Sequence, residues 1–105
     1  MTLSIDVKTL QELLQKNSVV LIDVREQSEY NESKIEGSLL MPLGELDANK
    51  VQELMLQNPD KTLVMQCRSG MRSAKACYLI ESANPNLKPH NLEGGIMAWK
   101  AMQNS

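Results

Sequence analysis

Short apolar runs alternate with longer segments of helical pattern along this sequence. Val19 to Ile22 and Thr62 to Met65 are continuous apolar or β-branched runs, and two further short strands are expected at 38–41 and 90–92. Continuous runs of this length are typical of strands buried on both faces of a parallel sheet. Strands that alternate with helices are joined by right-handed crossovers. The pattern therefore predicts an α/β fold with a mostly parallel central sheet and helices on both faces.

Five segments between and beyond these strands have helical patterns. Asp6 is a candidate cap for the first helix. The last helix opens at Gly94-Gly95 and is expected to bury Ile96 and Trp99. The expected helices span 7–17, 26–32, 46–57, 72–82 and the segment after Gly95. With 105 residues, of which 42% are hydrophobic, the chain has enough material for one core, so residues 1–105 are expected to form a single domain.

Composition and charge exclude several classes of function. Eleven basic and 13 acidic side chains give a net charge of -2, which disfavours binding to nucleic acid or to an anionic membrane. The first 17 residues lack the pattern of a signal peptide, and no stretch approaches about 18 apolar residues. We therefore expect a cytoplasmic protein. Two cysteines without a second Cys/His pair indicate neither a disulfide framework nor a zinc site.

The predicted topology indicates where a functional site should lie. Ligands of open α/β sheets bind beyond the carboxyl ends of the strands. Three distinctive segments occupy such positions, namely Asp23-Val24-Arg25, residues 67–72 and Gly94-Gly95. We expect these segments to be neighbours in space.

The segment from Cys67 to Arg72 has the properties of an anion-binding loop. It joins a strand to a helix, where loop N–H groups and the helix N-terminus can point at one anionic atom, and Gly70 allows the backbone to curl. An ordinary cysteine has a pKa of about 8.5, so ionisation at neutral pH needs a drop of about two units, or about 2.7 kcal/mol. A helix dipole supplies only about 0.3–1 kcal/mol. Amide hydrogen bonds together with Arg68 or Arg72 are expected to supply the rest.

Three motifs carry a resemblance to a known family. CRSGMRS after an apolar strand, LIDVRE upstream and NLEGGIMAWK downstream resemble a single-domain rhodanese, a sulfurtransferase with a three-layer α/β fold. The resemblance implies that Cys67 accepts a sulfane sulfur as a persulfide, that Asp23 and Arg25 support the site, and that Gly94-Gly95 and Trp99 fix the last helix. It further implies a substrate-binding loop formed by Arg68, Ser69, Gly70, Met71 and Arg72.

The resemblance also implies the partners of the reaction. The donor would be a small anion such as thiosulfate, or a polysulfide or persulfide, and the acceptor a thiol or another protein; no metal and no organic cofactor is required. The sequence departs from the family pattern in two places. Ser33-Lys34-Ile35 lacks the histidine that usually precedes this isoleucine, and the loop 84–89 is rich in proline and lacks glycine. These departures concern the rim of the site and the choice of partner.

Two other functions remain open at this point. Cysteine-based phosphatases and arsenate reductases also have an arginine after a cysteine loop, but with one more residue between them than the four that separate Cys67 from Arg72. A non-catalytic binding module, or a sulfur relay that serves a single protein partner, is the other alternative. The retention of Cys67 with both arginines weighs against a module that only binds.

Several of these residues also have purely structural interpretations. Arg25 can pair with Glu26 or Glu29, and Asp23 can cap a neighbouring loop. Cys77 shares a helical face with Ala74 and Tyr78, which favours a core role over a redox role. His90, the one histidine, begins a strand far along the chain from Cys67 and is not expected to form a Cys–His pair with it.

Overall fold

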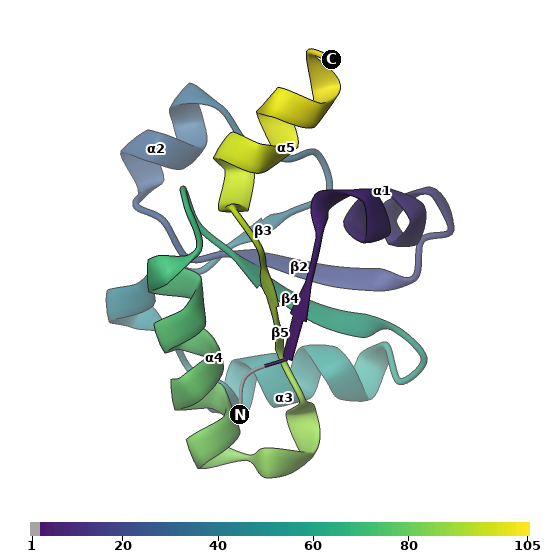
Figure 1. The fold of residues 1–105 in the computed structure, drawn as a ribbon. Helices are drawn as coiled ribbons and strands as arrows, with labels where there is room; N and C mark the ends of the chain where they lie inside the picture. The colour runs from purple at the N-terminus through teal and green to yellow at the C-terminus, as the bar shows by residue number, and fades with distance from the viewer. Residues whose placement is uncertain (1–2) are drawn as a thin grey trace.

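The protein is an α/β domain built on a five-stranded sheet, described for residues 3–105 by a computed structural model (Figure 1). The strand order is β1-β5-β4-β2-β3, and every neighbouring pair is parallel. The strands are β1 (Leu3–Ile5), β2 (Val19–Asp23), β3 (Leu39–Leu40), β4 (Thr62–Gln66) and β5 (His90–Leu92). The predicted fold class, a mostly parallel sheet with helices on both faces, is confirmed.

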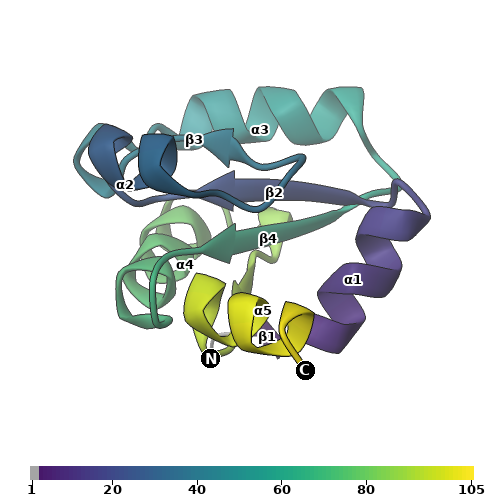
Figure 2. The same ribbon diagram turned by 90° about the horizontal axis from the view of Figure 1, so that it is seen from above.

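Helices cover both faces of this sheet. Figures 1 and 2 show α1 and α5 together on one side, α3 and α4 on the other, and α2 beyond the carboxyl ends of the strands. The helices are α1 (Val7–Gln15), α2 (Gln27–Glu32), α3 (Ala48–Gln57), α4 (Met71–Ala83) and α5 (Gly95–Gln103), with two 3-10 turns, η1 (Leu43–Glu45) and η2 (Pro85–Leu87). None of the helices between residues 3 and 105 has the length and the apolar composition that a bilayer crossing requires.

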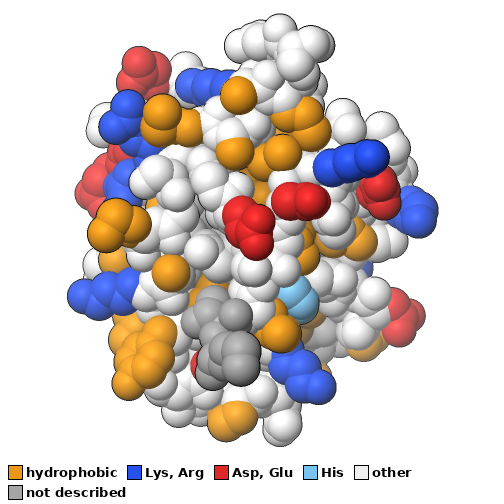
Figure 3. All heavy atoms as spheres, in the orientation of Figure 1, with side chains coloured by type: hydrophobic (Ala, Val, Ile, Leu, Met, Phe, Trp, Pro, Cys, Tyr) orange, Lys and Arg blue, Asp and Glu red, His pale blue; other side chains and the backbone are white. Residues whose placement is uncertain are grey.

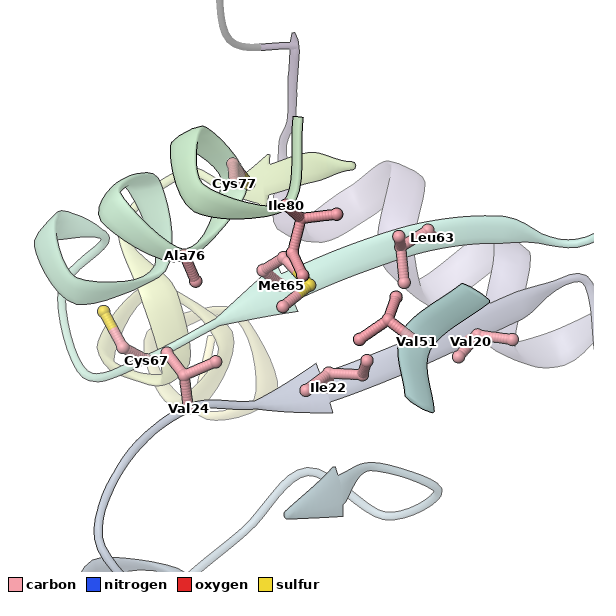
Figure 4. Close-up of a cluster of buried hydrophobic side chains, with 10 residues drawn as sticks. All are labelled: Val20, Ile22, Val24, Val51, Leu63, Met65, Cys67, Ala76, Cys77 and Ile80. Atoms are coloured by element: carbon pink, nitrogen blue, oxygen red, sulfur yellow. The ribbon is translucent and has the colours of Figure 1, made fainter. Parts of the chain in front are cut away.

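The core consists of two clusters, one on each face of the sheet. Alternate residues of β2 and β4 contribute to opposite clusters: Leu21 and Val64 face α1 and α5, whereas Ile22 and Met65 face α3 and α4. Figure 4 shows the second cluster, in which Cys67 lies at the end of the row of residues from β4. Both central strands are therefore buried on both faces, which explains why their sequences are continuous apolar runs.

Some boundaries differ from the predictions. The edge strand β1 was not predicted, because three residues carry too little pattern, and it forms only by pairing with β5. The third helix begins at Ala48 and not at Leu46, since the Asp47 side chain accepts hydrogen bonds from the amides of Asn49 and Lys50 and so caps the helix. The strand predicted over 38–41 is reduced to the two residues of β3.

The buried face of α4 also differs from the prediction. Ser73, Ala76, Cys77 and Ile80 face the core, at the spacing expected of one helical stripe. Tyr78, which was expected to share the face of Cys77, is 65% exposed. The prediction for Cys77 as a core residue holds, but its neighbours on that face are Ser73, Ala76 and Ile80.

Candidate active site

Cys67 lies at the carboxyl edge of the sheet, directly after β4 and before α4 (Figure 4). Its side chain points toward the first turn of α4, and the residue is only 1% exposed. Gly70 caps this helix with a φ of 110°, a left-handed conformation that a residue with a Cβ rarely adopts. The glycine thus turns the loop back over the sulfur atom, as the sequence led us to expect.

The sulfur of Cys67 accepts hydrogen bonds from its own loop and from α4. The donors are the amide of Gly70 at 3.1 Å, the amide of Ser73 at 3.4 Å and the hydroxyl of Ser73 at 3.4 Å. Burial raises the pKa of the Cys67 thiol, but the bonds from Ser73, Gly70 and Ser69 outweigh this effect, so the pKa is lowered overall. Hydrogen bonds, and not the arginines, are therefore the main cause of the lowered pKa of Cys67.

Ser73→Ala is expected to raise the pKa of Cys67 by about half a unit to one unit, because one hydrogen bond to the thiolate is lost. The pH dependence of alkylation by iodoacetamide measures this shift. Ser69→Ala is the matched control, since Ser69 acts on the sulfur through its backbone and its side chain is exposed. Equal shifts in the two variants would contradict the role of the Ser73 hydroxyl.

A side chain from β5 completes the support of the loop. Asn91 donates from Nδ2 to the carbonyl of Gly70 at 3.1 Å, and its Oδ1 accepts a short hydrogen bond from the hydroxyl of Ser73. The single proton of this hydroxyl is therefore shared between Asn91 Oδ1 and the sulfur of Cys67. Asn91 thus ties β5 to both the loop and α4. Neither Asn91 nor Ser73 was among the predicted site residues. Both could have been found in the sequence, because Ser73 is the last residue of the motif CRSGMRS and Asn91 is the first residue of the motif NLEGGIMAWK.

The N-terminus of α5 holds the cysteine loop from the opposite side. The amide of Ile96 donates to the carbonyl of Cys67 at 2.9 Å, and the amide of Met97 donates to the carbonyl of Arg68 at 3.1 Å. This close approach requires glycine at position 95, because a Cβ there would lie 2.4 Å from the Cys67 oxygen. The segments 67–72 and Gly94-Gly95 are thus brought together at one edge.

Asp23 and Arg25 form a buried ion pair next to this edge. Arg25 Nη2 lies 2.8 Å from Asp23 Oδ2, Arg25 Nε donates to both carboxylate oxygens, and Nη2 also donates to the carbonyl of Ser33 at 2.7 Å. The interpretation in which Arg25 pairs with Glu26 or Glu29 is therefore wrong. The pair thus ties the end of β2 to Ser33, the residue that follows α2.

Arg72 is also engaged in an ion pair, with Glu29 of α2. Its Nη1 and Nη2 donate to the two carboxylate oxygens at 2.7 Å and 2.9 Å. The hydrogen bonds from Arg72 lower the pKa of Glu29 to about 2, and the same bonds raise the pKa of Arg72. Arg68 is exposed, and Met71 is 82% exposed at the first position of α4. The two arginines of the loop are therefore not equivalent. Within residues 3–105, Arg72 forms an ion pair and Arg68 forms none.

The remaining thiol and the histidine lie apart from this constellation. Cys77 is fully buried, and burial followed by the charge of Glu81 raises its pKa to about 12. His90 pairs in register with Val64, and its Nδ1 lies 3.3 Å from the carbonyl oxygen of Leu63. The ring therefore lies next to the amino-terminal part of β4, whereas Cys67 follows the carboxyl end of that strand. The expectation that His90 does not pair with Cys67 agrees with this position.

A polar groove of about 460 Å³ opens beside the cysteine loop, between α2 and α5. Arg68 lies on its wall, with Arg25, Glu29 and Ser33 on the side of β2 and α2 and Met97 and Lys100 on the side of α5. A larger depression of about 620 Å³, next to Tyr78, Pro85 and Lys88, includes no residue of the cysteine loop. Of these two depressions, only the smaller groove is lined by a residue of the cysteine loop, Arg68.

These features define a class of protein: a parallel α/β domain in which a buried cysteine after a central strand is surrounded by loop amides. The family model described as "Rhodanese-like domain" matches residues 6–102. The chain belongs to the rhodanese-like family.

Individual relatives agree with this assignment. The chain is 39% identical over 80 residues to "Putative sulfurtransferase YtwF" of Bacillus subtilis, covering 76% of this chain and 72% of that protein. It is 32% identical over 91 residues to "Thiosulfate sulfurtransferase GlpE" of Pseudoalteromonas translucida, covering 86% and 81%. A rhodanese-related protein from Thermoplasma volcanium has a similar solved structure, with a TM-score of 0.75, 28% identity and coverage of 95% and 92%. Other curated relatives are longer, and the chain spans 49% of one and 21% of another.

Proposed function

We propose that this protein is a sulfurtransferase that carries sulfane sulfur on Cys67. The observation that carries the proposal is the buried Cys67 sulfur, which accepts hydrogen bonds from the amides of Gly70 and Ser73 and from the Ser73 hydroxyl. Such donors stabilise a thiolate before the reaction and a persulfide anion after it. The names of the relatives from Bacillus subtilis and Pseudoalteromonas translucida support the same activity.

The proposed reaction has two steps. The Cys67 thiolate attacks the outer sulfur of an anionic donor such as thiosulfate, a new S–S bond forms, and the donor's own S–S bond breaks. Sulfite leaves with the electron pair of that bond, and the enzyme retains one sulfur atom as a persulfide. A thiol or cyanide then attacks the terminal sulfur and restores the thiolate. The two half-reactions predict ping-pong kinetics.

The loop residues have distinct roles in this proposal. Ser69, Gly70 and Ser73 provide the donors around the sulfur, while exposed Arg68 attracts the donor anion. Met71 stands at the exposed start of α4, where an acceptor would approach. Asp23 and Arg25 act through the framework as supports. No metal or organic cofactor takes part.

Intact-protein mass spectrometry tests the proposal. Reduced protein incubated with thiosulfate is expected to gain the mass of one sulfur atom, and cyanide is expected to remove it as thiocyanate. The Cys67→Ser variant should gain none. If the wild-type protein gains no sulfur from thiosulfate, a polysulfide or a thiosulfonate replaces it as donor. Failure with all three, together with a Cys67 thiol inert to alkylation, would favour a non-catalytic binding module.

A further inference from the structure

Three arginines surround the cysteine loop, and two of them are already paired. Arg25 is buried and bonded to Asp23, and Arg72 is bonded through both of its terminal nitrogens to Glu29. Arg68 makes no ion pair within the described range 3–105. Of the two arginines within the loop, Arg72 is therefore neutralised in the folded protein and Arg68 is not.

The orientation of Glu29 is fixed by its own helix. Its Oε1 also accepts a hydrogen bond from the amide of Glu26 at 3.0 Å, which closes a capping box at the start of α2. Glu29 is thus held toward α4 by the helix N-terminus and by Arg72 together, and its side chain is only 29% exposed. Figure 3 shows acidic and basic side chains gathered side by side over the region of α2, at the upper left of the view. An incoming anion has to compete with a bidentate partner for Arg72.

We propose that Glu29 is a specificity-determining residue: by occupying Arg72, it favours sulfur donors with a single negative charge over the dianion thiosulfate. This inference rests on the proposed function. Arg68 and the paired Arg72 and Glu29 together present one net positive charge to a donor, and Lys100 and Glu32, which also line the groove, carry opposite charges. This single positive charge balances only half of the charge of a dianion that approaches the Cys67 thiolate, whereas it balances the whole charge of a monoanion.

Two donors that differ mainly in charge provide the test. Thiosulfate carries two negative charges and methanethiosulfonate carries one, because a methyl group replaces one oxyanion. In both cases the thiolate takes the outer sulfur and an S–S bond breaks, so that sulfite or methanesulfinate leaves with the bonding pair. The readout is the ratio of kcat/KM for thiosulfate to kcat/KM for methanethiosulfonate, with cyanide as the acceptor. A change in the reactivity of Cys67 alone affects both donors and largely cancels in this ratio.

Glu29→Gln is expected to raise the ratio about threefold to fivefold at low ionic strength, the scale of one partly exposed charge interaction. The glutamine oxygen can still accept from the amide of Glu26, so α2 keeps its cap. The increase should shrink at about 0.5 M salt, since screening weakens the attraction of the freed Arg72 for the dianion.

Glu32→Gln is the matched control, because it removes the same charge from the same helix and the same groove without releasing an arginine. Its ratio should rise much less than that of Glu29→Gln, because no arginine is freed to bind the dianion. Arg72→Gln leaves Glu29 uncompensated and should lower the ratio, which keeps the proposal testable if Glu29→Gln folds poorly in a thermal melt. The proposal is overturned if Glu29→Gln and Glu32→Gln move the ratio equally, or if Arg72→Gln raises it. Absence of sulfur loading from both donors would instead reject the proposed function, and this inference with it.

Discussion

Cys67→Ser is expected to abolish sulfur transfer, with a loss of turnover on the order of 10⁴-fold or more. A serine hydroxyl stays protonated at neutral pH and forms no persulfide, so neither half-reaction can proceed. The substitution removes one buried sulfur atom and leaves the hydrogen-bond donors of Gly70 and Ser73 in place. Thiocyanate formation from thiosulfate or methanethiosulfonate and cyanide measures the loss, and mass spectrometry reports whether any sulfur remains bound.

Cys77→Ala is the control for the first prediction. Cys77 is buried among apolar side chains of α4 and β4, and its raised pKa keeps the thiol protonated at neutral pH. We expect sulfur loading to survive, with a loss of stability of about 1 kcal/mol from the small cavity left by the sulfur. A comparable loss of transfer in both variants, with both still folded, would contradict the assignment of the chemistry to Cys67 alone.

Gly95→Ala is expected to have the largest effect on the integrity of the site, at about 2–4 kcal/mol of folding free energy. An added Cβ would lie 2.4 Å from the oxygen of Cys67 and 2.5 Å from the oxygen of Arg68, and both are backbone atoms that cannot rotate away. The φ of 57° at this position also disfavours alanine. Either α5 or the cysteine loop must move, and the hydrogen bonds from Ile96 and Met97 to the loop are weakened.

Chemical denaturation measures the stability loss, and the pH profile of Cys67 alkylation reports the displacement of the loop. Gly44→Ala is the matched control, because no atom lies within 4 Å of the added Cβ and the residue lacks a positive φ. It should change stability by less than about 1 kcal/mol. If Gly95→Ala were as stable as Gly44→Ala and kept the wild-type alkylation profile, the close approach of α5 would not be needed to hold the loop.

Much of the fold could be predicted because its signals are local. The runs in β2 and β4 are continuous and apolar since those strands lie between two helical layers, and Asp6 caps α1 by accepting from the amide of Thr9. The positions of Cys67 and Gly70 followed from the junction of a strand and a helix. The sequence was less informative at β1 and β3, where two or three residues become strands only because a neighbouring strand is available.

The ion pairs around the cysteine could not be predicted from the sequence. Both arginines of the loop were expected to serve the anion, because sequence distance gave no indication that Arg72 would meet Glu29, 43 positions away. The hydrogen bond from Ser73 to Asn91 spans 18 positions, and although each residue belongs to one of the three motifs, no sequence pattern pairs the two side chains.

By itself, the sequence determined the alternation of strands and helices, the parallel sheet, and a cysteine loop at its carboxyl edge, since each depends on neighbouring residues or on a short period. Only the tertiary structure decided which polar groups the loop would meet, because that choice depends on how α2, α5 and β5 pack around it. Those contacts neutralise Arg72, hold the loop carbonyls and place the Ser73 hydroxyl beside the sulfur.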